Sequence, residues 1–131
     1  MKIGLIGLGI MGKPMAKNIL KGGYTDLLVS DLNKAAVDEV VAAGAKAASN
    51  QEIGEQCDVV MTMLPNSPHV KSVMLTAGTG VANFMHAGQV FIDMSSINPV
   101  ASKEIAAALA EKGVEMLDAP VSGGEPKAID G

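Results

Sequence analysis

The sequence has 131 residues, enough for one domain with a hydrophobic core. Hydrophobic residues make up 48% of it and aromatic residues only 2%, so we expect a folded core built from aliphatic side chains and methionine. The net charge of −4, without a lysine or arginine cluster and without aromatic stacking platforms, argues against a nucleic-acid binder. The single cysteine, Cys57, excludes an internal disulfide and fits a reducing compartment.

An apolar run near the N-terminus, residues 3–11, follows Lys2 as the core of a signal peptide would. Its glycines at fixed spacing, and the Lys13-Pro14 pair without a small-residue cleavage pattern, argue against that interpretation. No later apolar run approaches the roughly 20 residues of a membrane helix. We therefore expect a soluble, cytoplasmic protein with no membrane partner.

Short apolar runs alternate with longer amphipathic stretches, a rhythm typical of βα repeats and a parallel sheet. Spacing and cap residues predict helices over residues 11–20, 34–43 after the cap Asn33, from the cap Ser67 before Pro68, and from the cap Asn98 to about 112. The apolar runs predict strands at residues 3–6, 27–29, 59–64, 90–94 and 114–117. We predict one α/β domain over residues 1–131, with a Rossmann-type, doubly wound, mainly parallel sheet that is incomplete at the C-terminus.

A glycine fingerprint, Gly7-Leu8-Gly9-Ile10-Met11-Gly12, connects the first strand to the first helix. In such a motif the first glycine allows a tight turn, the second lets a pyrophosphate approach the backbone, and the third allows close packing of the helix. The N-terminus of the helix offers unpaired N–H groups to phosphate oxygens. Glycine-rich turns are common between strands and helices, but here strand, turn and helix occur together. We predict that residues 7–12 hold the pyrophosphate of a dinucleotide.

An acidic residue, Asp31, follows Gly12 by 19 positions, at the end of the second predicted strand. A carboxylate at about 20 residues from the fingerprint accepts hydrogen bonds from the adenosine ribose and repels a 2′-phosphate. NADP would favour a nearby arginine, whereas Lys34 is the only cation nearby. The alternative is a solvent-facing residue or a helix cap. Asp31 therefore predicts NAD (NADH) as the cofactor, in preference to NADP.

Four segments in order resemble the signature of the β-hydroxyacid dehydrogenase family. They are Leu-Ile-Gly-Leu-Gly-Ile-Met-Gly-Lys-Pro-Met-Ala-Lys-Asn (residues 5–18), Met-Leu-Pro-Asn-Ser (63–67), Ile-Asp-Met-Ser-Ser (92–96) and Asp-Ala-Pro-Val-Ser-Gly-Gly (118–124). The resemblance spans essentially the whole chain. It implies an oxidoreductase that acts on the CH–OH group of a small carboxylic acid.

The resemblance also implies roles for single residues. Leu64 and Pro65 are expected to line the cofactor near the nicotinamide, and Ser96 and Ser95 to contact it as well. Ser122, Gly123 and Gly124 are expected to hold the substrate carboxylate through a hydroxyl and backbone N–H groups. Without the resemblance, the two serines indicate only strand-end or cap chemistry, and the Ser-Gly-Gly segment indicates a flexible turn. By itself His69 indicates only an exposed helix residue, although the family can contact the cofactor there.

Residues 63–70 and 122–128 most resemble the tartronate semialdehyde reductases of this family, which interconvert tartronate semialdehyde (2-hydroxy-3-oxopropanoate) and D-glycerate. Dehydrogenases of 3-hydroxyisobutyrate or 2-(hydroxymethyl)glutarate are the alternatives within the family. From a different class, a non-catalytic dinucleotide-binding module or a flavin-binding protein stays open. His69, His86 and Cys57 lack metal-ligand spacing.

The resemblance places the catalytic lysine of the family, and the helical domain that supports its homo-oligomers, beyond Gly131. Lys127 lies too close to Gly124 to be that lysine. A proton donor is needed because hydride transfer to a carbonyl leaves a developing alkoxide. We therefore expect an N-terminal, cofactor-binding part of a reductase that forms homo-oligomers, with no catalytic residue among these 131 and no activity of its own.

Overall fold

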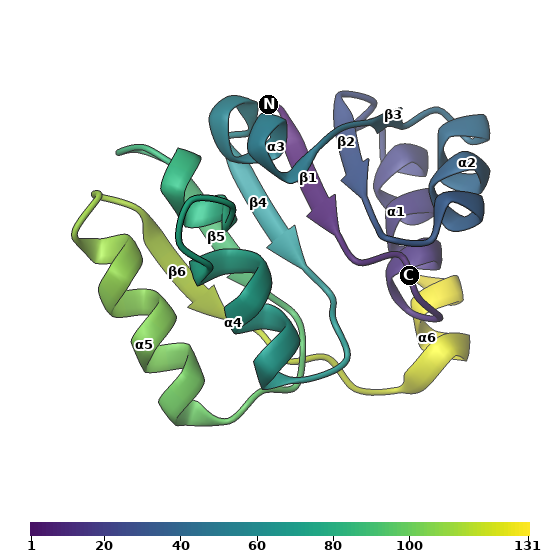
Figure 1. The fold of residues 1–131 in the computed structure, drawn as a ribbon. Helices are drawn as coiled ribbons and strands as arrows, with labels where there is room; N and C mark the ends of the chain where they lie inside the picture. The colour runs from purple at the N-terminus through teal and green to yellow at the C-terminus, as the bar shows by residue number, and fades with distance from the viewer.

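Six parallel strands form the central sheet of the computed structural model, which describes residues 1–131 (Figure 1). Their order across the sheet is β3-β2-β1-β4-β5-β6. The strands are β1 (Ile3–Ile6), β2 (Leu27–Ser30), β3 (Lys46–Ala47), β4 (Val59–Thr62), β5 (Val90–Asp93) and β6 (Glu115–Asp118). This order reverses between β1 and β4, so the doubly wound, Rossmann-type sheet predicted from the sequence is confirmed.

Helices cover both faces of the sheet (Figure 1). One face packs against α1 (Gly12–Lys21) and α2 (Lys34–Ala42). The other face packs against α3 (Asn50–Gln56), α4 (Ser67–Leu75), the 3-10 helix η1 (Val81–Phe84) and α5 (Pro99–Ala110). The last helix, α6 (Gly124–Asp130), lies against α1 rather than on the sheet. None of these helices has both the length and the apolar character that crossing a bilayer requires.

Alternating side chains of the strands divide the core into two clusters. Leu5 of β1 packs with Ala16 of α1 and Val40 of α2, and all three are fully buried. On the opposite face, Phe91 of β5 packs with Ile105 of α5 and is also fully buried. Because both faces of the central strands are covered, these strands appear in the sequence as continuous apolar runs.

Cap residues set the starts of most helices. Asn33 and Asn98 cap α2 and α5 as predicted: Asn33 accepts two backbone N–H groups of the first turn and Asn98 accepts one. For α4 the prediction was wrong by one residue: Asn66 is the cap, its side chain accepts the N–H of His69, and Ser67 already belongs to the helix. The sequence interpretation missed α3, which begins with a capping box between Ser49 and Glu52.

Candidate functional site

A cleft lies at the carboxyl ends of β1, β2 and β4, where the strand order reverses. One cavity of about 570 Å³ extends from Asp31 to His69. A second cavity, of about 290 Å³, lies over the glycine turn. The two share Gly7, Asp31, Leu64 and Pro65 in their walls. Open α/β sheets bind their ligands at this point, where crossovers leave on opposite faces. The structure therefore brings the predicted fingerprint, Asp31 and the Leu64-Pro65 pair to one cleft, together with His69.

At two positions of the turn only glycine fits, because a backbone carbonyl group lies too close for a side chain. Gly7 has a φ of +105°, and a side chain there would overlap the carbonyl oxygen of Met63. A side chain at Gly12 would overlap the carbonyl oxygen of Gly7 itself. The third glycine therefore lets α1 start directly against the turn. This sharpens the expectation that it allows the helix to pack closely.

Gly9 differs from its neighbours because it faces open space. A Cβ atom added there would meet no other atom within 4 Å. The backbone N–H groups from Gly9 to Gly12 donate to no protein acceptor, as expected at the start of a helix. The turn thus presents a row of free donors beside an open surface, at the positive end of the α1 dipole. These features fit the pyrophosphate of a dinucleotide.

Asp31 connects the glycine turn to the start of α2. Its Oδ2 accepts the backbone N–H of Leu8 at 2.7 Å, and its Oδ1 accepts the N–H of Asn33 at 2.7 Å. The side chain is half-buried and borders both cavities of the cleft. Each carboxylate oxygen keeps a lone pair for a further hydrogen bond. Asp31 is thus placed both to bind a ribose hydroxyl and to hold the turn.

Ser95, which the family resemblance assigns to the cofactor, lies beneath the surface of the cleft. It is fully buried, and its hydroxyl accepts the backbone N–H of Leu64 at 2.8 Å. Ser95 therefore supports the floor of the cleft from below. Ser96, the next residue, is exposed beyond the end of β5 and lies outside the two cavities.

A buried polar pair beneath Ser95 was missed from the sequence. Asp93 Oδ1 accepts the hydroxyl of Thr62 and the backbone N–H of Ser95, both at 2.9 Å. Asp93 and Thr62 are fully buried, and Asp93 Oδ2 has no hydrogen-bond partner. The network joins the ends of β4 and β5 under Leu64. Its signal in the sequence is a polar residue at the end of each of two otherwise apolar strands.

The Ser122-Gly123-Gly124 segment follows β6, ends at the first residue of α6 and is exposed. Ser122 and Gly123 line a cavity of about 680 Å³ together with Met11 and Met15 of the α1 region. The N–H groups of Gly123 and Gly124 donate to no protein acceptor. The structure therefore brings this segment to the end of the fingerprint, but not into the two cavities that contain Asp31.

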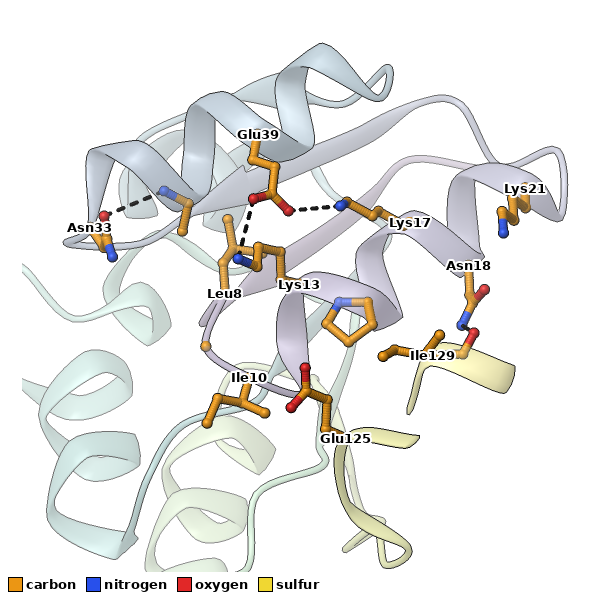
Figure 2. Close-up of a pocket in the computed structure, with 13 residues that line it drawn as sticks. Leu8, Ile10, Lys13, Lys17, Asn18, Lys21, Asn33, Glu39, Glu125 and Ile129 are labelled. Carbon is orange, nitrogen blue, oxygen red and sulfur yellow. Dashed lines mark hydrogen bonds and ion pairs between the residues drawn. The ribbon is translucent and has the colours of Figure 1, made fainter. Parts of the chain in front are cut away.

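A fourth cavity, of about 640 Å³, lies between α1, α2 and α6 (Figure 2). Lys13 and Lys17 of α1 reach across it to Glu39 of α2, at 3.3 and 2.7 Å. The hydrogen bonds from Lys17 and then Lys13 lower the pKa of the Glu39 carboxyl below its usual value. Both lysines are thus occupied by surface ion pairs, and we assign this cavity no ligand.

The parallel sheet, the glycine turn with free N–H groups and the carboxylate at the end of β2 define a dinucleotide-binding protein of the Rossmann class. Residues 2–131 match the family described as the NAD binding domain of 6-phosphogluconate dehydrogenase, and the chain belongs to this family. The cofactor class is accordingly a nicotinamide dinucleotide.

Several characterised relatives share this region. The chain is 48% identical to 2-(hydroxymethyl)glutarate dehydrogenase of Eubacterium barkeri and 47% identical to NAD-dependent L-serine dehydrogenase of Pseudomonas aeruginosa, covering 99% of this chain and 43% of each relative. It is 39% identical to 2-hydroxy-3-oxopropionate reductase of Escherichia coli, covering 100% of this chain and 44% of the relative. The chain thus spans less than half the length of these relatives.

A solved structure agrees with these relatives. The 3-hydroxyisobutyrate dehydrogenase from Salmonella typhimurium superposes with a TM-score of 0.89 at 36% identity, over 99% of this chain and 45% of that one. The resemblance to the β-hydroxyacid dehydrogenases is therefore confirmed. The relatives are named for several different substrates, and tartronate semialdehyde is not singled out among them.

Proposed function

We propose that this chain is the cofactor-binding part of an NADH-dependent reductase that interconverts tartronate semialdehyde and D-glycerate. The observation that supports it best is the glycine turn, with its free backbone N–H groups from Gly9 to Gly12 beside Asp31. In this proposal the turn holds the pyrophosphate, Asp31 binds the adenosine ribose, and Leu64 and Pro65 line the nicotinamide side. Bound NADH supplies a hydride to the substrate.

The preference for NADH over NADPH rests on charge at the end of β2. Asp31 would repel a 2′-phosphate, and its carboxylate is held in place by two backbone N–H groups. The chain contains no arginine, and Lys34 is the cation nearest in sequence. Titration of the protein with NADH and NADPH, followed by nucleotide fluorescence, tests the preference. We expect NADH to bind at least about tenfold more tightly, and tighter binding of NADPH would overturn the proposal.

The substrate carboxylate is assigned to the Ser122 hydroxyl and the N–H groups of Gly123 and Gly124. Three observations support this assignment. The segment is exposed, the two glycine N–H groups have no protein acceptor, and Ser122 and Gly123 line the same cavity as Met11. We assign Ser96 to direct contact with the cofactor. Ser95 would affect the cofactor indirectly, because its hydroxyl holds the backbone N–H of Leu64. We propose none of the 131 residues as the proton donor.

The particular substrate is proposed from residues 63–70 and 122–128. A panel of tartronate semialdehyde with NADH, and of D-glycerate, 3-hydroxyisobutyrate and 2-(hydroxymethyl)glutarate with NAD⁺, tests it on the full-length protein. We expect the highest kcat/KM for the tartronate semialdehyde and D-glycerate pair. A higher value for 2-(hydroxymethyl)glutarate, the substrate in the name of the 48% identical relative, would replace this assignment without affecting the cofactor proposal.

We also propose that the full-length protein is a cytoplasmic homo-oligomer, from the family resemblance and from Cys57, the single and free cysteine of these 131 residues. Size-exclusion chromatography with light scattering tests the oligomeric state. A monomer at micromolar concentration would contradict it.

A further inference from the structure

One side chain connects the helix that follows the glycine turn to the helix that follows the Ser-Gly-Gly segment. Asn18 lies in the middle of α1 and is half-buried. Its Nδ2 donates to the carbonyl oxygen of Ala128 at 2.6 Å and to that of Ile129 at 3.3 Å, both in α6. Figure 2 shows Asn18 beside Ile129. These residues are more than a hundred positions apart in the chain.

The helix that receives these hydrogen bonds is short and lies at the surface. α6 spans 7 residues and contains no buried residue. A helix this short is unstable in isolation, and its last carbonyl groups have no partner within the helix. The amide of Asn18 satisfies two of those carbonyls from outside. It therefore acts as a C-terminal cap supplied by another helix.

The residue type at position 18 is informative because asparagine is a poor former of helix interiors. It follows Met15 by three positions and so lies on the same side of α1. Its side chain borders the cavities on both sides of α6, the one that contains Ser122 and the one in Figure 2. Asn18 thus marks the place where α6 rests on α1.

This contact fixes the position of the Ser-Gly-Gly segment relative to the glycine fingerprint, which the proposed reaction requires. α1 begins at Gly12, the last residue of the fingerprint, and α6 begins at Gly124, the last residue of the Ser-Gly-Gly segment. Because each helix starts where its ligand-binding segment ends, holding one helix against the other also holds one segment relative to the other.

We propose that Asn18 is a positioning residue: its amide caps α6 and thereby sets the place of Ser122-Gly123-Gly124 relative to the cofactor turn. The proposal rests on the proposed function for its meaning, since it assigns the carboxylate of the acid substrate to that segment. The hydrogen bonds themselves do not depend on that assignment, so the two can be tested separately.

The first measurement is amide hydrogen exchange in the Asn18→Asp variant, which keeps the shape but places a carboxylate against the carbonyl oxygens. Asn18→Leu is the second variant, in case the added charge disturbs folding. We expect exchange of residues 125–131 to rise about tenfold or more, the effect of losing one or two net hydrogen bonds. Asn18→Gln, which keeps the amide donor, should restore part of the protection. Lys21→Leu, an exposed change in the last turn of the same helix, is the control and should leave exchange unchanged.

The second measurement separates the two ligands in the full-length protein. With Asn18→Leu we expect KM for the acid substrate to rise about tenfold, while the Kd for NADH stays within about twofold, because the glycine turn itself is untouched. Unchanged exchange in residues 125–131 would overturn the proposal. A Kd for NADH that rises as much as KM would also overturn it, since Asn18 would then act on the whole helix. Raised exchange without turnover of any acid by the wild-type protein would contradict the proposed function and leave the capping role established.

Discussion

Two glycine turns of this protein use the same residue type for different physical reasons. In the turn from Gly7 to Gly12, a side chain at either end would overlap a backbone carbonyl oxygen. In the segment Ser122 to Gly124, every residue is exposed. Gly123 has a φ of +110°, and a side chain there would overlap only the side chain of Lys127, one helical turn further on, and no backbone atom. The first turn is fixed by packing. The second is fixed by local conformation and by the contact of α6 with Asn18.

The difference bears on how each turn meets its proposed ligand. The cofactor turn is surrounded by buried strands and is held to β2 by the hydrogen bond from Leu8 to Asp31, so its free N–H groups are in place before a ligand arrives. Preorganised donors lose little freedom on binding. The Ser-Gly-Gly segment has few buried contacts, and such segments open locally at low free-energy cost. We therefore expect substitutions in the first turn to lower the free energy of unfolding, and substitutions in the second turn to increase only local opening.

The largest effect is expected from Gly7→Ala. The positive φ strains any side chain, and the methyl group would overlap the carbonyl oxygen of Met63. Together we expect a loss of about 3 kcal/mol or more in the free energy of unfolding. Urea denaturation followed by circular dichroism measures it.

The matched control is Gly9→Ala in the same turn. A Cβ there meets no atom within 4 Å, so the free energy of unfolding should stay within about 0.5 kcal/mol. NADH affinity should nevertheless fall, because the methyl group occupies the surface assigned to the pyrophosphate. Equal destabilisation by the two substitutions would contradict the distinction drawn between packed and open glycines.

The next effect is expected from Asp31→Ala, which leaves the N–H of Leu8 without its acceptor. A hydrogen bond to a charged group contributes about 1.5–3 kcal/mol, and partial exposure of Asp31 favours the lower end. Asp31→Asn keeps one acceptor oxygen and should lose less. Thermal unfolding and NADH titration of both variants test this. If Asp31→Ala lowers NADH affinity without any loss of stability, Asp31 binds the ribose but does not hold the turn.

The fold was predictable wherever buried strands gave apolar runs and cap residues marked helix starts. The strand β3 escaped because it has only two residues, Lys46 and Ala47, and both are exposed. The helix α3 could have been found, since Ser49 and Glu52 have the spacing of a capping box. α6 could not, because it is held by Asn18 from the other end of the chain, and no local pattern reports such a contact.

The candidate site divides in the same way. The glycine fingerprint and Asp31 were predictable because their roles depend on spacing along one βαβ unit. That Asp31 also accepts the N–H of Leu8 depends on how the second strand ends beside the turn, which spacing does not specify. The expected cofactor contact of Ser95 came only from the family resemblance, and the residue pattern alone indicated strand-end or cap chemistry. The hydrogen-bond donor to Ser95, the backbone N–H of Leu64, lies just beyond the end of the neighbouring strand, which spacing along the chain does not specify.

Alkaline pH should lower the free energy of unfolding through the thiol of Cys57. Burial raises the pKa of its thiol from 9.0 to about 11, and its sulfur packs beneath Gly4 of β1. The unfolded thiol therefore ionises first. The contribution of the neutral Cys57 thiol to the free energy of unfolding is fully present below pH 9. It is lost as pH rises towards 11, by a total on the order of 2 kcal/mol.

Urea denaturation at pH 8 and at pH 10.5 measures this loss, with Cys57→Ala as the reference for all other titrating groups. We expect a smaller decrease in the variant than in the wild type, although the variant starts from lower stability because a buried side chain is truncated. Parallel curves for the two proteins would show that Cys57 does not carry the effect.

The smallest effect is expected from Gly123→Ala, and it tests the second turn directly. A φ of +110° is strained for alanine, which costs about 1–2 kcal/mol where the conformation is enforced. Because the segment is exposed, we expect it to relax, so global stability should change by less than about 0.5 kcal/mol while hydrogen exchange in residues 125–131 increases. Gly78→Ala, an exposed glycine with a φ of +80° and open surroundings elsewhere in the fold, is the control for strain alone and should leave α6 unchanged. A global loss as large as that of Gly7→Ala would mean that the Ser-Gly-Gly segment is as firmly packed as the cofactor turn, and the contrast between the two turns would not hold.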